Sequence, residues 1–346
     1  MMRPLAFAIP GDIATLTGGY IYERRLLQGL RAAGHDVHHL ELPASFPDPS
    51  AADMAKAVAA LAQVPPDRPL ILDGLVFGSI DTGGLGQVRA PLVAMIHHPL
   101  AQETGLTPDR RDHLFRTERD NLRLVRHVLV PSPHTRRILT DRYDVPPDAI
   151  TVLRPGVDRP RLPPAPAAPP LILSVGILHP RKGHDILLDA LSLLPDLDWQ
   201  AVIVGNPWDR DHAAALERQR GASPLAARIR LAGRVSADEL EELYARAAIF
   251  ALATHYEGHG IVFDEALVRG LPIVSCSAGA VPDTVPQGAG LLVPPGDAAT
   301  FAAALRQVIA DPGQRRAMAD TALAAGLLLP GWQQMADGAS RVLSRI

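Results

Sequence analysis

Short apolar runs alternate with amphipathic segments along the whole chain. Near the start, the run PLAFAIP (4–10) is followed by GGYIYERRLLQGLRAAG (18–34). The first predicts a buried strand, and the second predicts an amphipathic helix that ends at Gly34. Apolar runs that are bounded by turn residues and separated by helical periods are typical of parallel sheets built from βα units. Four further runs predict strands in this half of the chain: DVHHLEL (36–42), PLILDGLV (69–76), PLVAMIHH (91–98) and HVLVPS (127–132).

A proline-rich stretch interrupts this alternation at RPGVDRPRLPPAPAAPP (154–170). Proline lacks a backbone donor and stiffens the chain, so we expect a linker between two domains here. Beyond it the alternation restarts, with helices predicted at 184–194 and at 236–247, the second of them capped by Ser236. Six runs predict the strands of this half: PLILSVG (170–176), WQAVIVG (199–205), RIRLAG (228–233), AIFALAT (248–254), PIVSC (272–276) and GLLVPPG (290–296).

The alternation predicts two doubly wound α/β domains, each with a parallel sheet, that face each other across a cleft. The length of 346 residues suits two domains of roughly 150 residues each. We place the first domain at 1–156, the linker at 157–170 and the second domain at 171–330. In such sheets ligands bind beyond the carboxyl ends of the strands, so the loops that follow the strands should carry the chemistry.

Composition and charge exclude several classes of protein. Apolar residues make up 47% of the chain, which is enough for two packed cores, and the net charge of −3 gives no general attraction to nucleic acid or acidic lipid. The single cysteine, Cys276, excludes an intrachain disulfide and a cysteine-based zinc cluster. The N-terminal run is too short for a signal peptide, and no run approaches the roughly 20 apolar residues of a transmembrane helix. We expect a soluble, cytoplasmic protein, and peripheral contact with a membrane stays open.

The stretch EGHGIVFDE (257–265) places two acids on a strand–loop–helix unit. Glu257 lies in the loop and Glu265 at about the second turn of the following helix, so roughly 10 Å should separate them. That distance is long for a shared proton or a shared metal ion. It suits two contacts along one extended ligand, with the free amides at 259–262 facing an anion between them. Two acids that simply face solvent are the alternative.

Two basic residues, Arg181 and Lys182, follow the first strand of the second domain in VGILHPRKGHD (175–185). A guanidinium fork and a mobile ammonium beside a helix start suit a diphosphate, whereas a solvated basic turn is the alternative.

In the first domain, adjacent Gly18 and Gly19 let the backbone approach a ligand at a helix start, or else form a tight turn. Neither a GxGxxG nor a GxxxxGK[ST] phosphate loop is present.

Paired histidines, His97 and His98, end one of the predicted strands of the first domain. Adjacent residues on a strand point in opposite directions, and neither HExxH nor a third spaced ligand is near in the sequence. We therefore expect no metal site and a single polar contact from His97 in the cleft. An ordinary surface histidine is the alternative.

These motifs together resemble a known family, the retaining GT-B glycosyltransferases of family 4, which transfer sugars from nucleotide donors. The resemblance extends over nearly the whole chain. Besides the Glu-x7-Glu pattern of EGHGIVFDE, four further segments match in the family's order. They are the GG loop with the helix that follows it and GHDV (34–37), then VLRPGVD, then SVGILHPRKGHDILLDAL, and finally GLPIVSCSAGAVPDTV with GLLVPPGD.

The resemblance implies roles for the donor-side residues. Glu265 would accept hydrogen bonds from the ribose hydroxyls of the donor nucleotide, and Glu257 would hold the transferred sugar. Arg181 and Lys182 would neutralise the diphosphate leaving group, on which negative charge grows in the transition state. The backbone amides of three neighbouring residues would assist: Gly260, Ile261 and Val262.

For the first domain, the resemblance implies that His97 lies near the face of the sugar. Gly18 and Gly19 would close over the phosphates or the acceptor. The last helix, at about 331–346, is expected to cross back onto this domain, which would bind the acceptor.

The implied reaction moves a hexose from a UDP- or GDP-sugar to a hydroxyl group, with retention of configuration and without a metal or another cofactor. The acceptor would be a sugar, a lipid-linked sugar or a small molecule. A nucleotide-sugar epimerase and a non-catalytic nucleotide-sugar-binding protein stay open as alternatives. A phosphorylase would be longer and would carry a pyridoxal lysine context that this sequence lacks.

Four positions depart from the family pattern. Ile177 stands where many members carry an arginine after the strand's glycine. Whether this replacement reduces phosphate binding stays open. Pro155 replaces the hinge asparagine and stiffens that position. Asp283 replaces a usual glutamate, and His259 replaces a common phenylalanine and is expected to bear on the choice of sugar.

Overall fold

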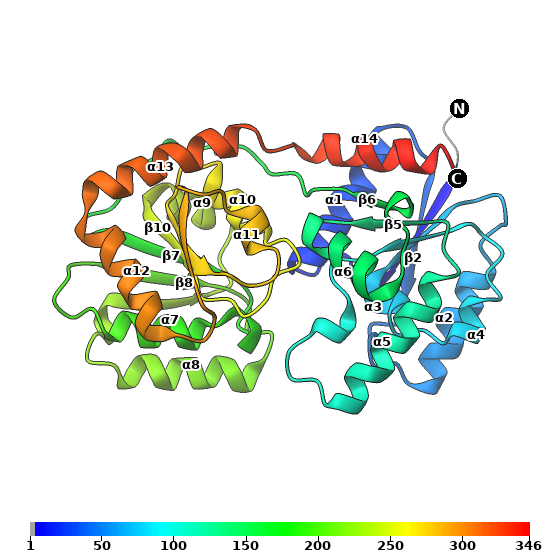
Figure 1. Cartoon of the computed structure of the whole chain (residues 1–346), viewed down its shortest axis with the longest axis horizontal. Coiled ribbons are helices and arrows are strands. Elements are labelled where there is room, and N and C mark those ends of the chain that lie inside the picture. Colours follow the sequence, from blue (N-terminus) through cyan, green and yellow to red (C-terminus); the bar gives the residue numbers. More distant parts are fainter. Residues whose placement is uncertain (1–3) are drawn as a thin grey trace. The chain divides into compact units, whose positions relative to one another are not determined.

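The computed structural model describes residues 4–346 and divides the chain into two compact units (Figure 1). The N-terminal unit comprises residues up to Gly156 together with Pro330–Ile346, and the C-terminal unit comprises Val157–Leu329. The first three residues of the predicted first domain lie outside the described part of the chain. The chain thus enters the C-terminal unit once and returns to the N-terminal unit for its last helix.

The N-terminal unit contains a six-stranded sheet in the order β2-β1-β3-β4-β5-β6, in which all neighbouring strands are parallel. The five strands predicted from apolar runs are confirmed. The short sixth strand was not predicted, because three residues are too few for a periodic signal. The strands are β1 (Leu5–Pro10), β2 (Val37–Leu42), β3 (Leu70–Asp73), β4 (Leu92–Met95), β5 (His127–Val130) and β6 (Ile150–Val152).

Helices cover this sheet, and hydroxyl and carboxylate caps mark where several of them begin. Ser50, Thr107 and Ser132 each accept a hydrogen bond from a backbone amide of the first turn that follows. The helices are α1 (Gly18–Ala32), α2 (Ala51–Ala62), α3 (Gly74–Phe77), α4 (Thr82–Leu85), α5 (Pro108–Leu122), α6 (Pro133–Tyr143) and α14 (Trp332–Leu343), with the 3-10 helices η1 (Leu100–Gln102) and η2 (Pro147–Ala149).

The last helix, α14, packs against α1 of the same unit (Figure 1). Gly29 permits this contact, since a Cβ atom there would lie 2.5 Å from the Cβ of Ala336. The guanidinium of Arg25 lies 5.4 Å from the centre of the Trp332 ring system. Close backbone approach and an aromatic contact therefore hold the C-terminal segment on the N-terminal unit.

The C-terminal unit contains a second six-stranded sheet, in the order β12-β11-β10-β7-β8-β9, again with parallel neighbours throughout. Its six strands correspond to the six predicted runs. They are β7 (Leu171–Val175), β8 (Gln200–Val204), β9 (Ile229–Gly233), β10 (Ala247–Leu252), β11 (Ile273–Cys276) and β12 (Gly290–Val293). The prediction of two doubly wound parallel sheets is confirmed.

Helices flank this sheet as well, and the predicted cap of one of them is confirmed. Ser236 Oγ accepts a hydrogen bond of 3.1 Å from the amide of Glu239. The helices are α7 (His184–Ser192), α8 (Arg210–Ala222), α9 (Ala237–Arg246), α10 (Ile261–Leu267), α11 (Val281–Thr284), α12 (Ala298–Ala310) and α13 (Pro312–Leu327), with η3 (Pro180–Lys182) and η4 (Ala226–Arg228). Within residues 4–346, no helix combines the length and the apolar character needed to cross a bilayer.

The segment between β6 and β7 has no regular secondary structure, and side chains fasten it to the C-terminal unit. Arg159 donates hydrogen bonds of 2.8 and 2.9 Å to the carbonyls of Gly326 and Leu329. The amide of Arg161 donates to Glu241 on α9. The proline-rich stretch is therefore anchored to this unit at Arg159 and Arg161.

Candidate functional site

The predicted basic and acidic residues of the C-terminal unit meet at the carboxyl edge of its sheet. β7 and β10 are neighbouring parallel strands, so the loops that follow them lie at the same edge. The first loop carries Arg181 and Lys182, and the second carries Glu257. Gly183, which has a φ of +61°, allows a close approach of the two loops, because a Cβ atom there would lie 2.0 Å from the carbonyl oxygen of Ala253.

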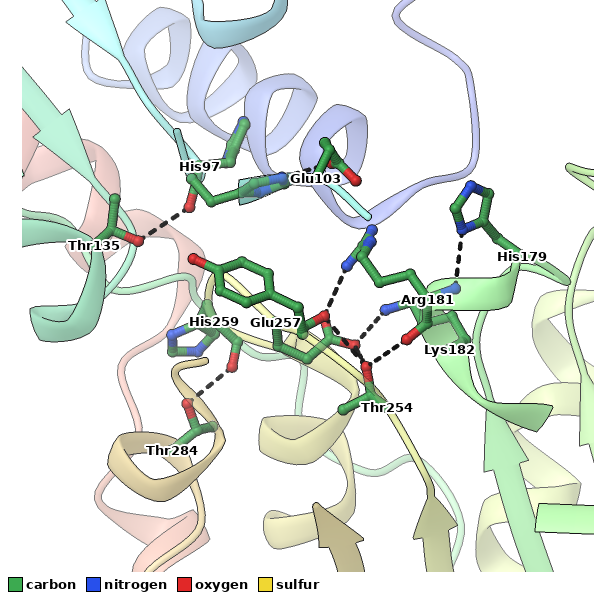
Figure 2. Close-up of polar contacts among 12 residues, drawn as sticks. His97, Glu103, Thr135, His179, Arg181, Lys182, Thr254, Glu257, His259 and Thr284 are labelled. Atoms are coloured by element: carbon green, nitrogen blue, oxygen red, sulfur yellow. Dashed lines mark hydrogen bonds and ion pairs between the residues drawn. The ribbon is translucent and has the colours of Figure 1, made fainter. Parts of the chain in front are cut away.

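Both cations point toward Glu257 (Figure 2). Lys182 Nζ lies 2.6 Å from Glu257 Oε1, and Arg181 Nη1 lies 3.7 Å from Oε2. Arg181 also donates a hydrogen bond of 2.9 Å to the carbonyl of Tyr256, and the hydroxyl of Thr254 lies 3.0 Å from Glu257 Oε1. The three charged side chains are largely buried, so the pair is shielded from solvent.

The charge state of Glu257 follows from these partners. Burial alone would raise the pKa of this carboxyl, but the charges of Lys182 and Arg181 and the hydrogen bonds from Lys182 and Thr254 outweigh it and lower the pKa below its ordinary value. Glu257 is therefore an anion at neutral pH. A diphosphate at this edge would compete with Glu257 for the same two cations, a relationship that the sequence analysis did not anticipate.

The helix start beside this cluster has no side-chain cap. Gly260 is the N-cap residue of α10, with a φ of +85°, and a Cβ atom there would lie 2.6 Å from the ring of Phe263. A glycine is therefore required for both backbone and steric reasons. The amides of Ile261 and Val262 open the helix, as the sequence analysis expected from the loop–helix boundary.

Glu265 lies further along α10 and has partners of its own. Its Oε2 accepts a hydrogen bond of 2.7 Å from the hydroxyl of Tyr244 on α9. Burial raises the pKa of Glu265, and the Tyr244 hydroxyl and the charge of Arg269 oppose this rise. Among residues 4–346, the side chains that contact Glu257 are different from the one that contacts Glu265, so the two acids do not form an acid/base pair.

A second buried pair lies between these two acids in sequence. His259 Nε2 is 2.6 Å from Asp264 Oδ2, and both side chains are buried. The backbone carbonyl of His259 accepts a hydrogen bond from Thr284 (Figure 2). His259 was predicted from the sequence as a site residue and Asp264 was not, although a histidine and an acid five positions apart across a helix start could have suggested the contact.

In the N-terminal unit, two acids that are distant from His97 in the sequence lie beside it in the structure. His97 Nε2 is 3.3 Å from Glu23 Oε1, and Asp73 completes a group whose ligand atoms all lie within 4.8 Å of one another. Asp73 also caps α3 by accepting from the amides of Leu75 and Val76. Glu23 lies on α1, which follows β1, Asp73 ends β3, and His97 follows β4. These three strands are neighbours in the sheet, and this strand order is not visible in the sequence.

The two carboxyls of this group share a buried environment. Burial raises the pKa of Glu23 to about 7 and the pKa of Asp73 well above its ordinary value, and it lowers the pKa of His97. Two adjacent buried carboxylates repel each other, so one of the two takes up a proton unless a cation lies between them. The group therefore holds a proton near neutral pH, with His97 in its neutral form.

The remaining predicted residues of this unit lie beside His97. Gly18 and Gly19 open α1, and a Cβ atom on Gly19 would lie 3.4 Å from the His97 ring. A Cβ atom on Gly18 would meet no atom within 4 Å. His98 lies 2.6 Å from Glu103, so the paired histidines contact different partners. The strand geometry from which this was expected does not apply, because β4 ends at Met95 and both histidines lie beyond it.

Two family models match consecutive parts of the chain. The model described as Glycosyltransferase Family 4 matches residues 77–161, and the model described as Glycosyl transferases group 1 matches residues 160–324. Together they cover more than two thirds of the sequence, including the cluster around Glu257 and the whole of α10.

Curated relatives agree with this assignment. The chain is 31% identical over 241 residues to the D-inositol 3-phosphate glycosyltransferase of Kineococcus radiotolerans, covering 61% of this chain and 55% of that one. It is also 31% identical over 236 residues to a GDP-mannose-dependent phosphatidylinositol monomannoside mannosyltransferase of Mycolicibacterium smegmatis, covering 61% and 60% of the two chains. The chain thus spans about half the length of the relatives it matches.

Solved structures share the fold over almost the full length. Sucrose-phosphate synthase from Thermosynechococcus elongatus superimposes with a TM-score of 0.84 at 21% identity, over 99% of this chain and 98% of that one. HepE from Anabaena, solved in complex with UDP-glucose, superimposes with a TM-score of 0.80 at 19% identity over 100% of both chains. At these identities the similarity establishes the GT-B fold.

Proposed function

Because this chain belongs to the group 1 glycosyltransferases, we propose that it transfers a hexose from a UDP- or GDP-sugar to a hydroxyl acceptor, with retention of configuration. The observation that carries the proposal is the buried cluster of Glu257, Lys182 and Arg181 beside the uncapped start of α10. At this edge of the sheet, two cations, a carboxylate and the first turn of α10 lie close together.

In this proposal the diphosphate binds to Lys182 and Arg181 and to the amides of Gly260, Ile261 and Val262. The bond between the anomeric carbon and the diphosphate oxygen breaks, and both cations stabilise the charge that grows on the leaving group. Glu257 then accepts hydrogen bonds from hydroxyls of the transferred sugar. Its lowered pKa keeps it an acceptor at neutral pH.

The acceptor hydroxyl attacks the anomeric carbon on the face that the leaving group vacates, and its proton passes to the leaving phosphate. No carboxylate nucleophile and no metal ion are required. We propose that the N-terminal unit binds the acceptor at the carboxyl edge of its sheet, where His97, Gly18 and Gly19 gather. Glu265 accepts hydrogen bonds from the ribose of the donor.

The identity of the donor base rests on two relatives that differ. HepE is described in complex with UDP-glucose, and the mycobacterial relative is named as dependent on GDP-mannose. The experiment below therefore uses both UDP and GDP. The acceptor is a sugar, a lipid-linked sugar or a small molecule. A cytoplasmic location stays a prediction, with which the one buried free thiol, Cys276, is compatible.

The test is a titration of the full chain with UDP and GDP, followed by an assay of sugar release and transfer from UDP- and GDP-hexoses. We expect one nucleotide to bind and the matching donor to be turned over, with the anomeric configuration of the product read by NMR. Binding without turnover would favour the non-catalytic alternative, and interconversion of donor sugars would favour an epimerase. Absence of binding to either nucleotide would refute the proposal.

A further inference from the structure

The carboxylate of Glu265 is held in place by α9. Tyr244, which is buried, donates the hydrogen bond of 2.7 Å to Glu265 Oε2. Arg269 lies over the Tyr244 ring, with its guanidinium carbon 4.4 Å from the ring centre, and donates a hydrogen bond of 2.9 Å to the backbone carbonyl of Glu265. Both the side chain and the backbone of Glu265 are thus fixed by groups that are themselves packed.

The same arginine belongs to a buried ion pair. Arg269 Nη2 lies 2.5 Å from Glu241 Oε2, and the two side chains are 11% and 9% exposed. The other oxygen of Glu241 accepts hydrogen bonds of 2.6 and 3.3 Å from the amides of Arg161 and Leu162. The pair therefore fastens the segment that enters the C-terminal unit to the helix that supports Glu265.

We propose that Tyr244 and the Arg269–Glu241 pair form a positioning network that aims Glu265 at the ribose of the donor nucleotide and couples ribose binding to the docking of residues 158–162. The inference rests on the proposed function, in which Glu265 binds the ribose. Tyr244 occupies Oε2, and within residues 4–346 no hydrogen bond or ion pair reaches Oε1. That oxygen is therefore the one presented to the ribose hydroxyls.

The electrostatics of the cluster explain why a positioning network is needed. A carboxylate that accepts from ribose hydroxyls must be ionised, but burial raises the pKa of Glu265. The groups that face it are Tyr244 and Arg269, which lower this pKa, and Asp158 and Asp264, which raise it further. Glu241 faces the other side of Arg269 and Tyr244.

The coupling to residues 158–162 follows from the same contacts. Asp158 disfavours the charged form of Glu265, whereas Arg269 favours it. Arg269 also pairs with Glu241, whose other oxygen accepts hydrogen bonds from the amides of Arg161 and Leu162. A ribose that stabilises the charged, oriented Glu265 strengthens its contact with Arg269 and, through Glu241, the docking of this segment. Linkage requires the effect to be reciprocal.

The test is Tyr244→Phe in the full chain, with UDP, GDP and the matching 2′-deoxynucleotide as probes in calorimetric titrations. Loss of the hydroxyl should raise the dissociation constant of the preferred nucleotide about 5–10-fold, in keeping with the net contribution of one typical hydrogen bond. It should also reduce the preference for the ribonucleotide over the 2′-deoxynucleotide. At saturating donor, kcat should change by less than about twofold, because the leaving-group contacts are intact.

Two readouts separate positioning from a merely structural role. Since Glu265 binds as the anion, affinity should rise with pH through its pKa, and Tyr244→Phe should move this transition to higher pH. Hydrogen exchange at the amides of Arg161 and Leu162 should slow when nucleotide binds to the wild type, and should slow less in the variant. Glu241→Gln, which keeps an acceptor for these amides but lacks the charge, should also weaken the exchange effect.

Tyr143→Phe is the control, since it removes a buried tyrosine hydroxyl from the N-terminal unit and should leave nucleotide affinity and its pH dependence unchanged. Thermal unfolding verifies that each variant is folded. If Tyr244→Phe leaves affinity, ribose preference and the pH transition unchanged while Glu265→Ala loses affinity, the positioning inference is wrong and the proposed function stands. If the wild type binds neither nucleotide, the positioning inference and the proposed function are both wrong.

Discussion

Lys182 has two roles: its ion pair with the buried Glu257 stabilises the fold, and in the proposed reaction its charge stabilises the leaving group. Lys182→Met tests both roles. Methionine keeps the length of the side chain and removes its charge, so Glu257 keeps only Arg181, at 3.7 Å, as a charged partner. A buried charge that loses its partner costs about 3–5 kcal/mol if it stays ionised. The carboxyl escapes this cost by taking up a proton.

The free-energy cost of protonating Glu257 sets an upper limit on the stability that Lys182→Met can lose. From an ordinary pKa of 4.5, protonating the carboxyl costs about 3.4 kcal/mol at pH 7 and about 0.7 kcal/mol at pH 5, at 1.36 kcal/mol for each pH unit. The wild-type pair stabilises the folded state above the unfolded pKa, and this contribution is lost as pH falls through the lowered folded pKa. We therefore expect Lys182→Met to lower the free energy of unfolding by about 2–3 kcal/mol at pH 7, and by less than about 1 kcal/mol at pH 5.

Urea unfolding at the two pH values measures this difference, and kcat with a saturating donor measures the other role of Lys182. We expect kcat to fall about 10²–10³-fold, as for the loss of one group that stabilises a developing anion. The double variant Lys182→Met/Glu257→Gln should recover part of the stability, because no buried carboxylate is left without its ammonium partner, and should stay inactive. Arg181 loses its charged partner in this variant but keeps its hydrogen bond to the carbonyl of Tyr256. Lys56→Met, at the only other lysine of the sequence, is the matched control, since Lys56 is exposed.

Two outcomes would refute this reasoning. The first is an equal loss of stability at pH 5 and pH 7, which would show that Glu257 does not carry a buried charge. The second is an unchanged kcat in the folded variant, which would remove Lys182 from the proposed site.

Three further predictions concern other groups. Glu265→Ala should weaken binding of the preferred nucleotide by about 1–3 kcal/mol, measured by titration, through lost hydroxyl contacts; unaltered affinity would make Glu265 structural. Because the pKa of Glu23 is raised to about 7, the folded state holds its proton more tightly than the unfolded chain, so stability should fall as pH rises from about 4.5 to 7. Glu23→Gln should reduce this slope in urea unfolding, and an identical slope would contradict the buried pair. Sugar transfer should survive EDTA; a loss that Mn²⁺ or Mg²⁺ restores would overturn metal independence and direct attention to Glu23, Asp73 and His97.

The alternation of apolar and amphipathic segments was enough to predict the fold class and eleven of the twelve strands that the structure contains. Hydrophobic periodicity is a local property, because each strand or helix buries its own face whatever its neighbours are. The same holds for Ser236, Gly260 and the boundary of α10, which depend on a few adjacent residues. The short strand Ile150–Val152 was missed because its pattern is too brief to stand out.

Pairing between distant residues required the tertiary structure. Arg181, Lys182 and Glu257 were predicted as separate contacts on a ligand, and only the adjacency of β7 and β10 makes them one buried cluster. Tyr244 was missed because nothing in the local sequence marks it as a partner of Glu265.

The group of Glu23, Asp73 and His97 shows the same limit most clearly. Only His97 stood out in its own segment, and 74 positions separate it from Glu23, which lies 3.3 Å away. Strand order decides which loop ends become neighbours, and burial then decides which of their side chains can be charged. Both are properties of the assembled sheet, since periodicity reports which face of an element is buried but not what it is buried against.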